Sequence, residues 1–154
     1  MELNCEPVVC LELTPMGKPR MSRQDTWKKR PPVQRFWEYK QQIRDSVFLP
    51  MIQKILKQPF FLIFALPIPK SWSKKKKLLF DCQPQKGKPD KDNLEKGFLD
   101  SALDEDKYCW AGTVVKLWLN EPIGRIILTP VWGDHSFDLQ YAELRAILTL
   151  RNEK

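Results

Sequence analysis

Residues 88–100 read Lys88-Pro89-Asp90-Lys91-Asp92-Asn93-Leu94-Glu95-Lys96-Gly97-Phe98-Leu99-Asp100, and this stretch carries most of the information about fold and chemistry. Its apolar positions predict a helix over residues 93–103, preceded by an acidic lead-in. In an extended lead-in, side chains at i and i+2 project to the same side. Asp90 and Asp92 are therefore expected to offer oxygen ligands to one divalent cation. Asp92 is also predicted to cap the helix and to form a capping box with Glu95.

Lys96 follows Asp92 by four residues, which places both side chains on one face of the predicted helix. There its ammonium group could contact a phosphate oxygen or stabilise developing negative charge. Acidic residues before a helix also occur as ordinary caps and surface ion pairs, which have no further function. However, the preceding segment, residues 83–89, is rich in turn residues and carries Lys86 and Lys88. A flexible basic loop leading into the acids favours phosphodiester chemistry.

Residues 89–103 resemble the signature of the RusA family, the phage and prophage endonucleases that resolve Holliday junctions. Residues 15–21, Pro-Met-Gly-Lys-Pro-Arg-Met, resemble the loop after the first strand of that family, and residues 110–118 resemble its next strand. The resemblance thus covers residues 8–128. It implies an α+β fold, a mixed β-sheet backed by helices, and a homodimeric, Mg²⁺-dependent nuclease. Asp90 and Asp92 then match two metal-site acids, and Lys96 matches the catalytic lysine.

One position departs from the family pattern. RusA proteins carry a third essential aspartate at the start of the strand after the motif helix, and ungapped counting places Ala111 there. Alanine has no side-chain oxygen to offer a metal. Three explanations are open: an engineered replacement of aspartate, a naturally degenerate copy, or a ligand shifted to Asp104, Glu105 or Asp106. The intact pattern around Ala111 favours the first.

Length and composition constrain the class of protein independently. The chain has 154 residues, which fits a single domain over residues 1–154, and 42% of them are hydrophobic, enough for a core. A formal net charge of +7 and a pI near 9.3 indicate a polyanionic partner, with nucleic acid as the first candidate.

The four cysteines show no C-x-x-C pairing and the one histidine is His135, so no zinc site is expected. The longest apolar run, residues 59–69, is too short to cross a bilayer, and no secretory leader is recognisable. We therefore expect a cytoplasmic protein with reduced thiols and no membrane partner.

Hydrophobic periodicity predicts the remaining elements. Apolar or alternating runs predict four strands, the last two forming a hairpin: residues 8–13, 60–66, 113–119 and 125–131. Apolar residues three or four apart predict helices over residues 33–48 and 50–56, a short helix capped by Ser71, and a C-terminal helical extension within residues 136–154. The first helix is expected to bury Phe36, Trp37, Tyr39, Ile43 and Val47.

Basic residues gather in a long polar loop, residues 14–32, which includes Trp27, and in a run of four lysines. Loops of this length in compact domains are usually functional or disordered. Four lysines in one helical turn repel one another, which costs stability and suggests a phosphate-binding surface, although a solvated charged face is the alternative. The residues predicted to contact DNA are Lys18, Arg20, Lys28, Lys29, Arg30, Lys74, Lys75, Lys76, Lys77, Lys86 and Lys88.

Together these features predict an Mg²⁺-dependent endonuclease for Holliday junctions or other branched DNA. A homodimer would place one site on each of two opposed strands. A second hypothesis keeps the fold and makes the protein a catalytically inactive junction-binding factor, with Ala111 as the discriminating residue. A third hypothesis combines Asp90 with Glu105 and Lys107 as a PD-(D/E)-x-K nuclease site. It is weak because Glu105 follows a helix directly and does not lie on a predicted strand.

Overall fold

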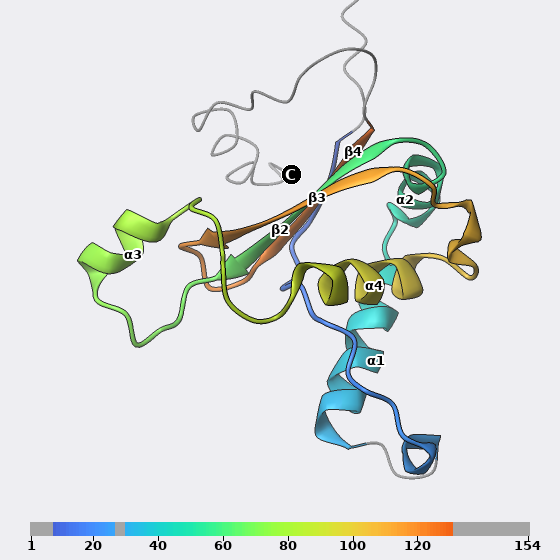
Figure 1. The fold of residues 1–154 in the computed structure, drawn as a ribbon, viewed down its shortest axis with the longest axis horizontal. Helices are drawn as coiled ribbons and strands as arrows, with labels where there is room; N and C mark the ends of the chain where they lie inside the picture. Colours follow the sequence, from blue (N-terminus) through green and yellow to red (C-terminus); the bar gives the residue numbers. More distant parts are fainter. Residues whose placement is uncertain (1–7, 27–29, 131–154) are drawn as a thin grey trace, which may run out of the picture.

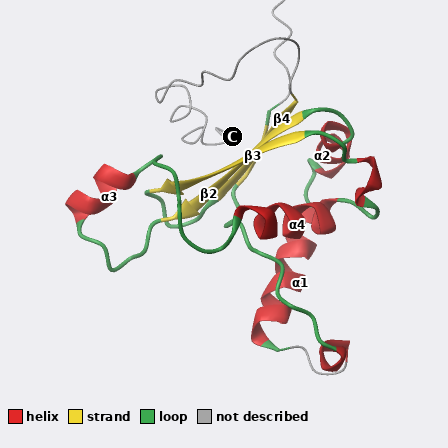
Figure 2. Ribbon diagram, in the orientation of Figure 1, coloured by secondary structure: helices red, strands yellow, loops and turns green. Residues whose placement is uncertain are grey.

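The computed structural model describes residues 8–26 and 30–130. At its centre is a four-stranded mixed sheet in the order β1-β4-β2-β3, with helices against it, which confirms the predicted α+β class (Figures 1 and 2). The strands are β1 (Val9–Leu11), β2 (Phe60–Pro67), β3 (Gly112–Leu119) and β4 (Arg125–Pro130). The predicted C-terminal helix, Trp27, Lys28 and Lys29 lie outside the described residues.

The strand β2 lies inside the sheet because its sequence is apolar on both faces. Every residue from 60 to 66 is buried. Alternate side chains enter two separate cores, Phe60 and Leu62 on one face and Phe61 and Ile63 on the other. The strand pairs in parallel with β3 and antiparallel with β4, and β4 pairs antiparallel with β1.

The predicted hairpin between the last two strands is wrong, because β2 lies between β3 and β4. The connection between them crosses the end of β2. At Gly124 a Cβ atom would lie 2.5 Å from the carbonyl oxygen of Ala65, so only glycine fits this approach without a shift. The N–H of Gly124 also donates a hydrogen bond to Thr14 Oγ1 at 3.0 Å. This order gives β2, which is apolar on both faces, a hydrogen-bonded neighbour on both edges.

Three helices cover one face of the sheet: α1 (Pro31–Arg44), α2 (Leu49–Leu56) and α4 (Lys91–Ala102). Phe36, Tyr39 and Ile43 of α1 are buried as predicted. Two other expected core residues are not, since Val47 is 87% exposed and Trp37 is 45% exposed. Val47 falls in the turn between α1 and α2, and the second residue of α2 is a proline, which could not continue α1 as one helix. Trp37 lies outside the buried face of α1, which consists of Val33, Phe36, Tyr39 and Ile43.

The fourth helix, α3 (Lys74–Phe80), lies at the end of the sheet away from α1 and α2 (Figure 1). Its cap is Ser73 and not Ser71, because Ser73 Oγ accepts a hydrogen bond from the Lys76 N–H at 3.3 Å. None of its seven residues is buried. Two 3₁₀ turns, Arg23–Thr26 and Asp106–Tyr108, complete the fold. Within the described ranges, no helix has the length and apolar character needed to cross a membrane.

Candidate active site

The two motif acids lie at the start of α4, which begins two residues earlier than predicted. Asp90 takes the N-cap position, with an extended backbone (φ −68°, ψ 148°), and its carbonyl accepts the first helical hydrogen bond from Leu94 at 3.0 Å. Asp92 is therefore already helical, and the predicted Asp92 cap and its capping box with Glu95 are wrong. The Asp90 side chain makes no capping hydrogen bond, and both carboxylates are exposed. An acid in the first turn is favoured by the helix dipole, which stabilises Asp92 where it lies.

The N-terminal basic loop packs directly against α4. A Cβ atom at Gly97 would lie 2.8 Å from the carbonyl oxygen of Met16, so the close contact requires glycine on the helix. On the other side, a Cβ atom at Gly17 would lie 2.5 Å from the amide nitrogen of Asn93. The backbone N–H of Lys18 donates to the Asn93 carbonyl at 3.5 Å. Two segments about 75 residues apart in the sequence therefore form one surface.

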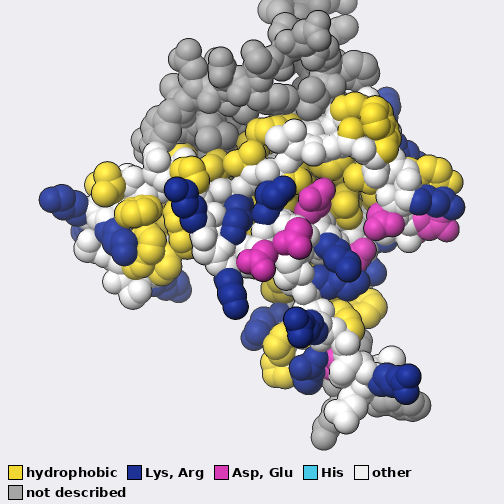
Figure 3. Space-filling model, viewed as in Figure 1, with side chains coloured by type: hydrophobic (Ala, Val, Ile, Leu, Met, Phe, Trp, Pro, Cys, Tyr) yellow, Lys and Arg dark blue, Asp and Glu magenta, His cyan; other side chains and the backbone are white. Residues whose placement is uncertain are grey.

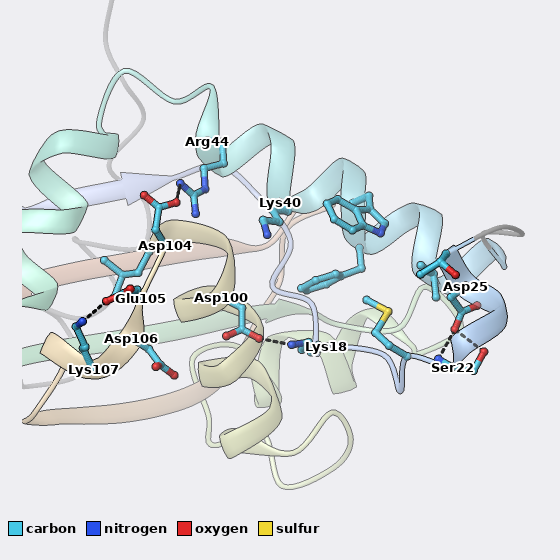
Figure 4. Close-up of a pocket in the computed structure, with 16 residues that line it drawn as sticks. Lys18, Ser22, Asp25, Lys40, Arg44, Asp100, Asp104, Glu105, Asp106 and Lys107 are labelled. Atoms are coloured by element: carbon cyan, nitrogen blue, oxygen red, sulfur yellow. Dashed lines mark hydrogen bonds and ion pairs between the residues drawn. The ribbon is translucent and has the colours of Figure 1, made fainter.

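Lys18 and Arg20 meet Lys96 at this surface. They line a shallow hollow of about 450 Å³ together with Asn93. The Lys18 ammonium group forms an ion pair with Asp100 at 2.5 Å, which Figure 4 shows between the loop and α4. Three of the basic residues predicted from sequence are therefore brought to the helix that carries the acids.

Arg30 has a structural partner in the same N-terminal basic loop, residues 14–32, which we call the basic arm. Its guanidinium group donates to Asp25 at 2.8 and 2.9 Å and to the carbonyl of Arg20 at 2.9 Å. These bonds, first of all those from Arg30, and the bonds from Ser22 hold the pKa of Asp25 well below its usual range. Arg30 thus braces the arm, and its predicted DNA contact remains a prediction.

The lysine run lies on α3, separated from the basic arm by α4 and its acids (Figures 1 and 3). The Lys76 ammonium group lies 3.8 Å from the centre of the Trp72 ring, and Lys77 donates to the carbonyl of Lys70 at 3.2 Å. Lys86 and Lys88 are exposed on the loop between α3 and α4. Among the described residues, the predicted DNA contacts therefore form two groups, one on each side of the candidate site.

Lys116 is a site residue that the sequence analysis missed. It lies on β3, and its ammonium group donates to the carbonyls of Gly87 and Pro89, the latter at 2.8 Å. Gln85, only 3% exposed, holds the same loop from inside, since its side chain donates to the Lys88 carbonyl at 2.9 Å and accepts from the Gly87 N–H at 3.2 Å. The backbone that enters Asp90 is thus fixed to the sheet. The sequence did contain a signal for this role, namely a lysine between Val115 and Leu117 in an otherwise apolar strand.

Ala111 lies directly before β3, half-buried, and its carbonyl accepts a hydrogen bond from the Phe60 N–H at 3.4 Å. Two residues earlier, burial raises the pKa of the Cys109 thiol, and the charges of Glu95 and Asp106 raise it further. Cys109 therefore lies within electrostatic reach of Glu95, in the second turn of α4.

The acids offered as a shifted third ligand follow the far end of α4. Asp104 pairs with Arg44 at 2.9 Å, and Glu105 pairs with Lys107. They line a larger hollow, about 920 Å³, whose wall also includes Asp100 but neither motif acid (Figure 4). The Glu105 to Lys107 segment enters a 3₁₀ turn and not a strand, which argues against a PD-(D/E)-x-K site. In the part of the chain described, no three acidic, histidine or cysteine side chains form a group suited to a metal ion.

A basic protein with two exposed carboxylates and a lysine on one helix, and with a lysine-bearing loop packed on that helix, has the features of an enzyme that processes phosphodiesters. The family model described as Endodeoxyribonuclease RusA matches residues 11–122, and the chain belongs to this family. The match confirms the family predicted from the motif and supports nuclease activity on DNA. Comparisons with curated proteins and with solved structures give no match.

Proposed function

We propose that this protein is a structure-specific endonuclease that resolves four-way DNA junctions with Mg²⁺ and acts as a homodimer. The observation that carries the proposal is the placement of Asp90, Asp92 and Lys96 on the first turns of α4, against the basic loop of Lys18 and Arg20. Membership of the RusA endodeoxyribonuclease family supports the reaction class. The bacterial cytoplasm, with a phage or prophage origin, is the setting that this function implies.

The donor set fits magnesium. Mg²⁺ is usually held through one or two carboxylates, with water and substrate phosphates completing its octahedron. Asp90 and Asp92 are two exposed carboxylates at the positively polarised start of a helix, where phosphate is also favoured. When bound, Mg²⁺ supplies Lewis-acid stabilisation of the charge that develops on the phosphate.

The remaining residues of the site bind and orient the DNA backbone. Lys96, one turn beyond Asp92, is placed to donate to a phosphate oxygen and to stabilise the charge of the transition state. The ion pair with Asp100 fixes the conformation of the Lys18 side chain and holds its ammonium group beside Lys96. Less side-chain entropy is therefore lost when a phosphate binds there. Lys116 keeps the entrance to Asp90 fixed and acts as a positioning residue.

Junction resolution needs two cuts, one on each of two opposed strands, and a two-fold dimer supplies two sites in fixed relation. Selectivity would come from the shape of the branch more than from base sequence, because the basic groups on α3 and the arm are suited to phosphates. To test the proposal, the affinity of the protein for a labelled four-way junction is compared with its affinity for duplex of the same sequence, and the junction should bind more tightly. In sedimentation, the protein should have twice the 18.2 kDa protomer mass. Equal affinity for both DNAs would refute junction recognition.

A second candidate function is junction binding without cleavage. It is favoured by Ala111, which leaves the predicted third ligand position without an oxygen, and by the lack of a three-acid group among the residues described. The two functions share the same DNA surface and differ only in turnover. Incubation of the junction with and without Mg²⁺ separates them.

Changing Lys74, Lys75, Lys76 and Lys77 to Gln should weaken DNA binding and flatten its dependence on salt. Each lost phosphate contact lowers the log–log slope by roughly 0.9 on duplex DNA. The measurement is anisotropy of labelled DNA across a salt series. A double change of Lys54 and Lys57 to Gln, at the end of α2, is the control and should leave the slope unaltered. If the α3 variant kept the slope of log affinity against log salt concentration of the unmodified protein, these lysines would only face solvent.

Lys116→Met should raise the Mg²⁺ concentration needed for half-maximal cleavage by about 10-fold or more, the range typical of groups that orient metal ligands. The effect is measured in a chain that carries the Ala111→Asp change, so that cleavage can be followed. Junction affinity and the melting temperature should change little, because the lost bonds lie on a half-exposed loop. Lys91→Met, an exposed lysine at the start of α4, is the matched control. An unchanged Mg²⁺ requirement would rule out the positioning role.

A further inference from the structure

The helix α3 exposes an apolar pair that nothing in the described fold covers. Leu78 is 68% exposed and Leu79 is 71% exposed. The helix has seven residues and none of them is buried. Isolated helices this short are marginal in water, and leucines gain stability only when they are covered. A partner that covers these leucines would therefore stabilise the helix.

A hollow of about 770 Å³ lies beside these leucines. Its walls are apolar or aromatic, from Leu79, Phe80, Pro84 and Trp118, and its polar rim includes Gln83 and Lys86. No acidic residue of the described chain lines it. A flat ring would find stacking surface on the walls and hydrogen-bonding groups at the rim, as pockets for small cyclic ligands usually provide.

The surroundings of the hollow are positively charged. The aromatic wall continues into Trp72, whose ring centre lies 5.2 Å from that of Phe80 and 5.3 Å from that of Trp118. Lys76 lies over the Trp72 ring, and the three other lysines of the run share its helix. An occupant with a flat apolar ring and a negatively charged chain matches both properties, and nucleotides have this chemistry.

The hollow also adjoins the candidate cleavage site. Gly87 belongs to its wall, and the Gly87 carbonyl accepts a hydrogen bond from Lys116, which also binds the carbonyl before Asp90. A nucleotide seated in the hollow would lie close to the phosphate held at α4. In duplex DNA the faces of the bases are covered by their neighbours, whereas at a branch the stacking is interrupted and a base can leave it at lower cost.

We propose that the hollow between α3 and the loop before α4 binds an unstacked base at the branch point, and that Leu78 and Leu79 fill the space this base leaves. Apolar side chains inserted at a base step are a common way of holding opened DNA. The lysines of α3 bind the adjoining phosphates. This inference rests on the proposed action on four-way DNA and adds a reason why branched DNA is preferred over duplex.

The test uses the intact protein and a four-way junction without Mg²⁺, with 2-aminopurine as the first base of one arm. Binding of the parent protein should raise the fluorescence of this base, because unstacking relieves its quenching. The double variant Leu78→Ser, Leu79→Ser should lose this rise and should lower the ratio of junction to duplex affinity by about 5-fold or more, the lower end of what one stacked base contributes. Its duplex affinity should stay at the parental value, since all the lysines remain.

The matched control is the double variant Val47→Ser, Ile123→Ser, which removes two exposed apolar side chains elsewhere and should keep the fluorescence rise. Retention of the rise and of the affinity ratio in the α3 variant would overturn the inference. So would a loss of the dimer in sedimentation, because the leucines would then be a contact between two copies of this chain. If the proposed function were wrong, the result would be different, because the unmodified protein itself would not bind the junction more tightly than duplex.

Discussion

Ala111→Asp should raise Mg²⁺-dependent cleavage of a four-way junction by roughly 10²- to 10³-fold, the range that one preorganised electrostatic group contributes. Two carboxylates leave the cation position relative to the phosphate underdetermined, and a third would fix it. The change is structurally mild, because Ala111 is only half-buried and lies just before the first residue of β3. Single-turnover cleavage of labelled junction measures the rate, and anisotropy should show little change in affinity.

A suitable control is Thr113→Asp, which adds the same charge two residues along the chain at an exposed position. It should leave cleavage near the level of the unmodified chain. If the Ala111 protein already cleaves junctions briskly and the Ala111→Asp change adds nothing, the third role belongs to Asp104, Glu105 or Asp106. The ion pairs of the first two would then have to open during the reaction.

Asp90→Asn and Asp92→Asn, each made in the Ala111→Asp chain, should abolish Mg²⁺-dependent cleavage while junction binding survives or tightens. Loss of one negative charge removes a metal ligand and also eases the approach of the phosphate backbone. Asp90→Asn should retain helix stability, because asparagine serves as well as aspartate at an N-cap and Asp90 makes no capping bond. Asp92→Asn should lose only the interaction of its charge with the helix dipole. Rates and affinities are measured on the same junction.

Asp45→Asn supplies the comparison for this pair. Asp45 is an exposed carboxylate at the end of α1, hydrogen-bonded only to its neighbour Gln41 among the bonds of the described chain, and its replacement should leave cleavage intact. Cleavage at the parental rate by either motif variant would make that carboxylate a surface residue of the helix start, and the proposed metal site would be wrong.

Local sequence patterns were sufficient to predict those helices and strands that can be recognised from their own residues. The apolar run at 60–66 predicted a buried strand, and the spacing of Phe36, Tyr39 and Ile43 predicted the buried face of α1. Helix limits were harder to predict. Several polar residues near each start could serve as the cap, and the choice of Asp90 over Asp92 and of Ser73 over Ser71 depends on the backbone path that enters the helix.

The same limit applies to the site. The motif predicted which residue types gather at α4, since their spacing is local. It could not predict that Lys116 would hold the loop before Asp90, because that contact joins residues 27 apart and depends on β3 lying beside β2. Likewise, the pairing of Lys18 with Asp100 spans 82 residues.

The sequence by itself determined the family, the acid pair, the basic character and the positions of most helices and strands, because these follow from composition, periodicity and a compact motif. Only the tertiary structure decided the strand order, the seating of the basic loop on Gly97 and the exposure of α3. Periodicity records which side of an element is apolar but not which neighbour covers it. That choice is made when β2, apolar on both faces, takes the interior of the sheet and separates two strands that are adjacent in sequence.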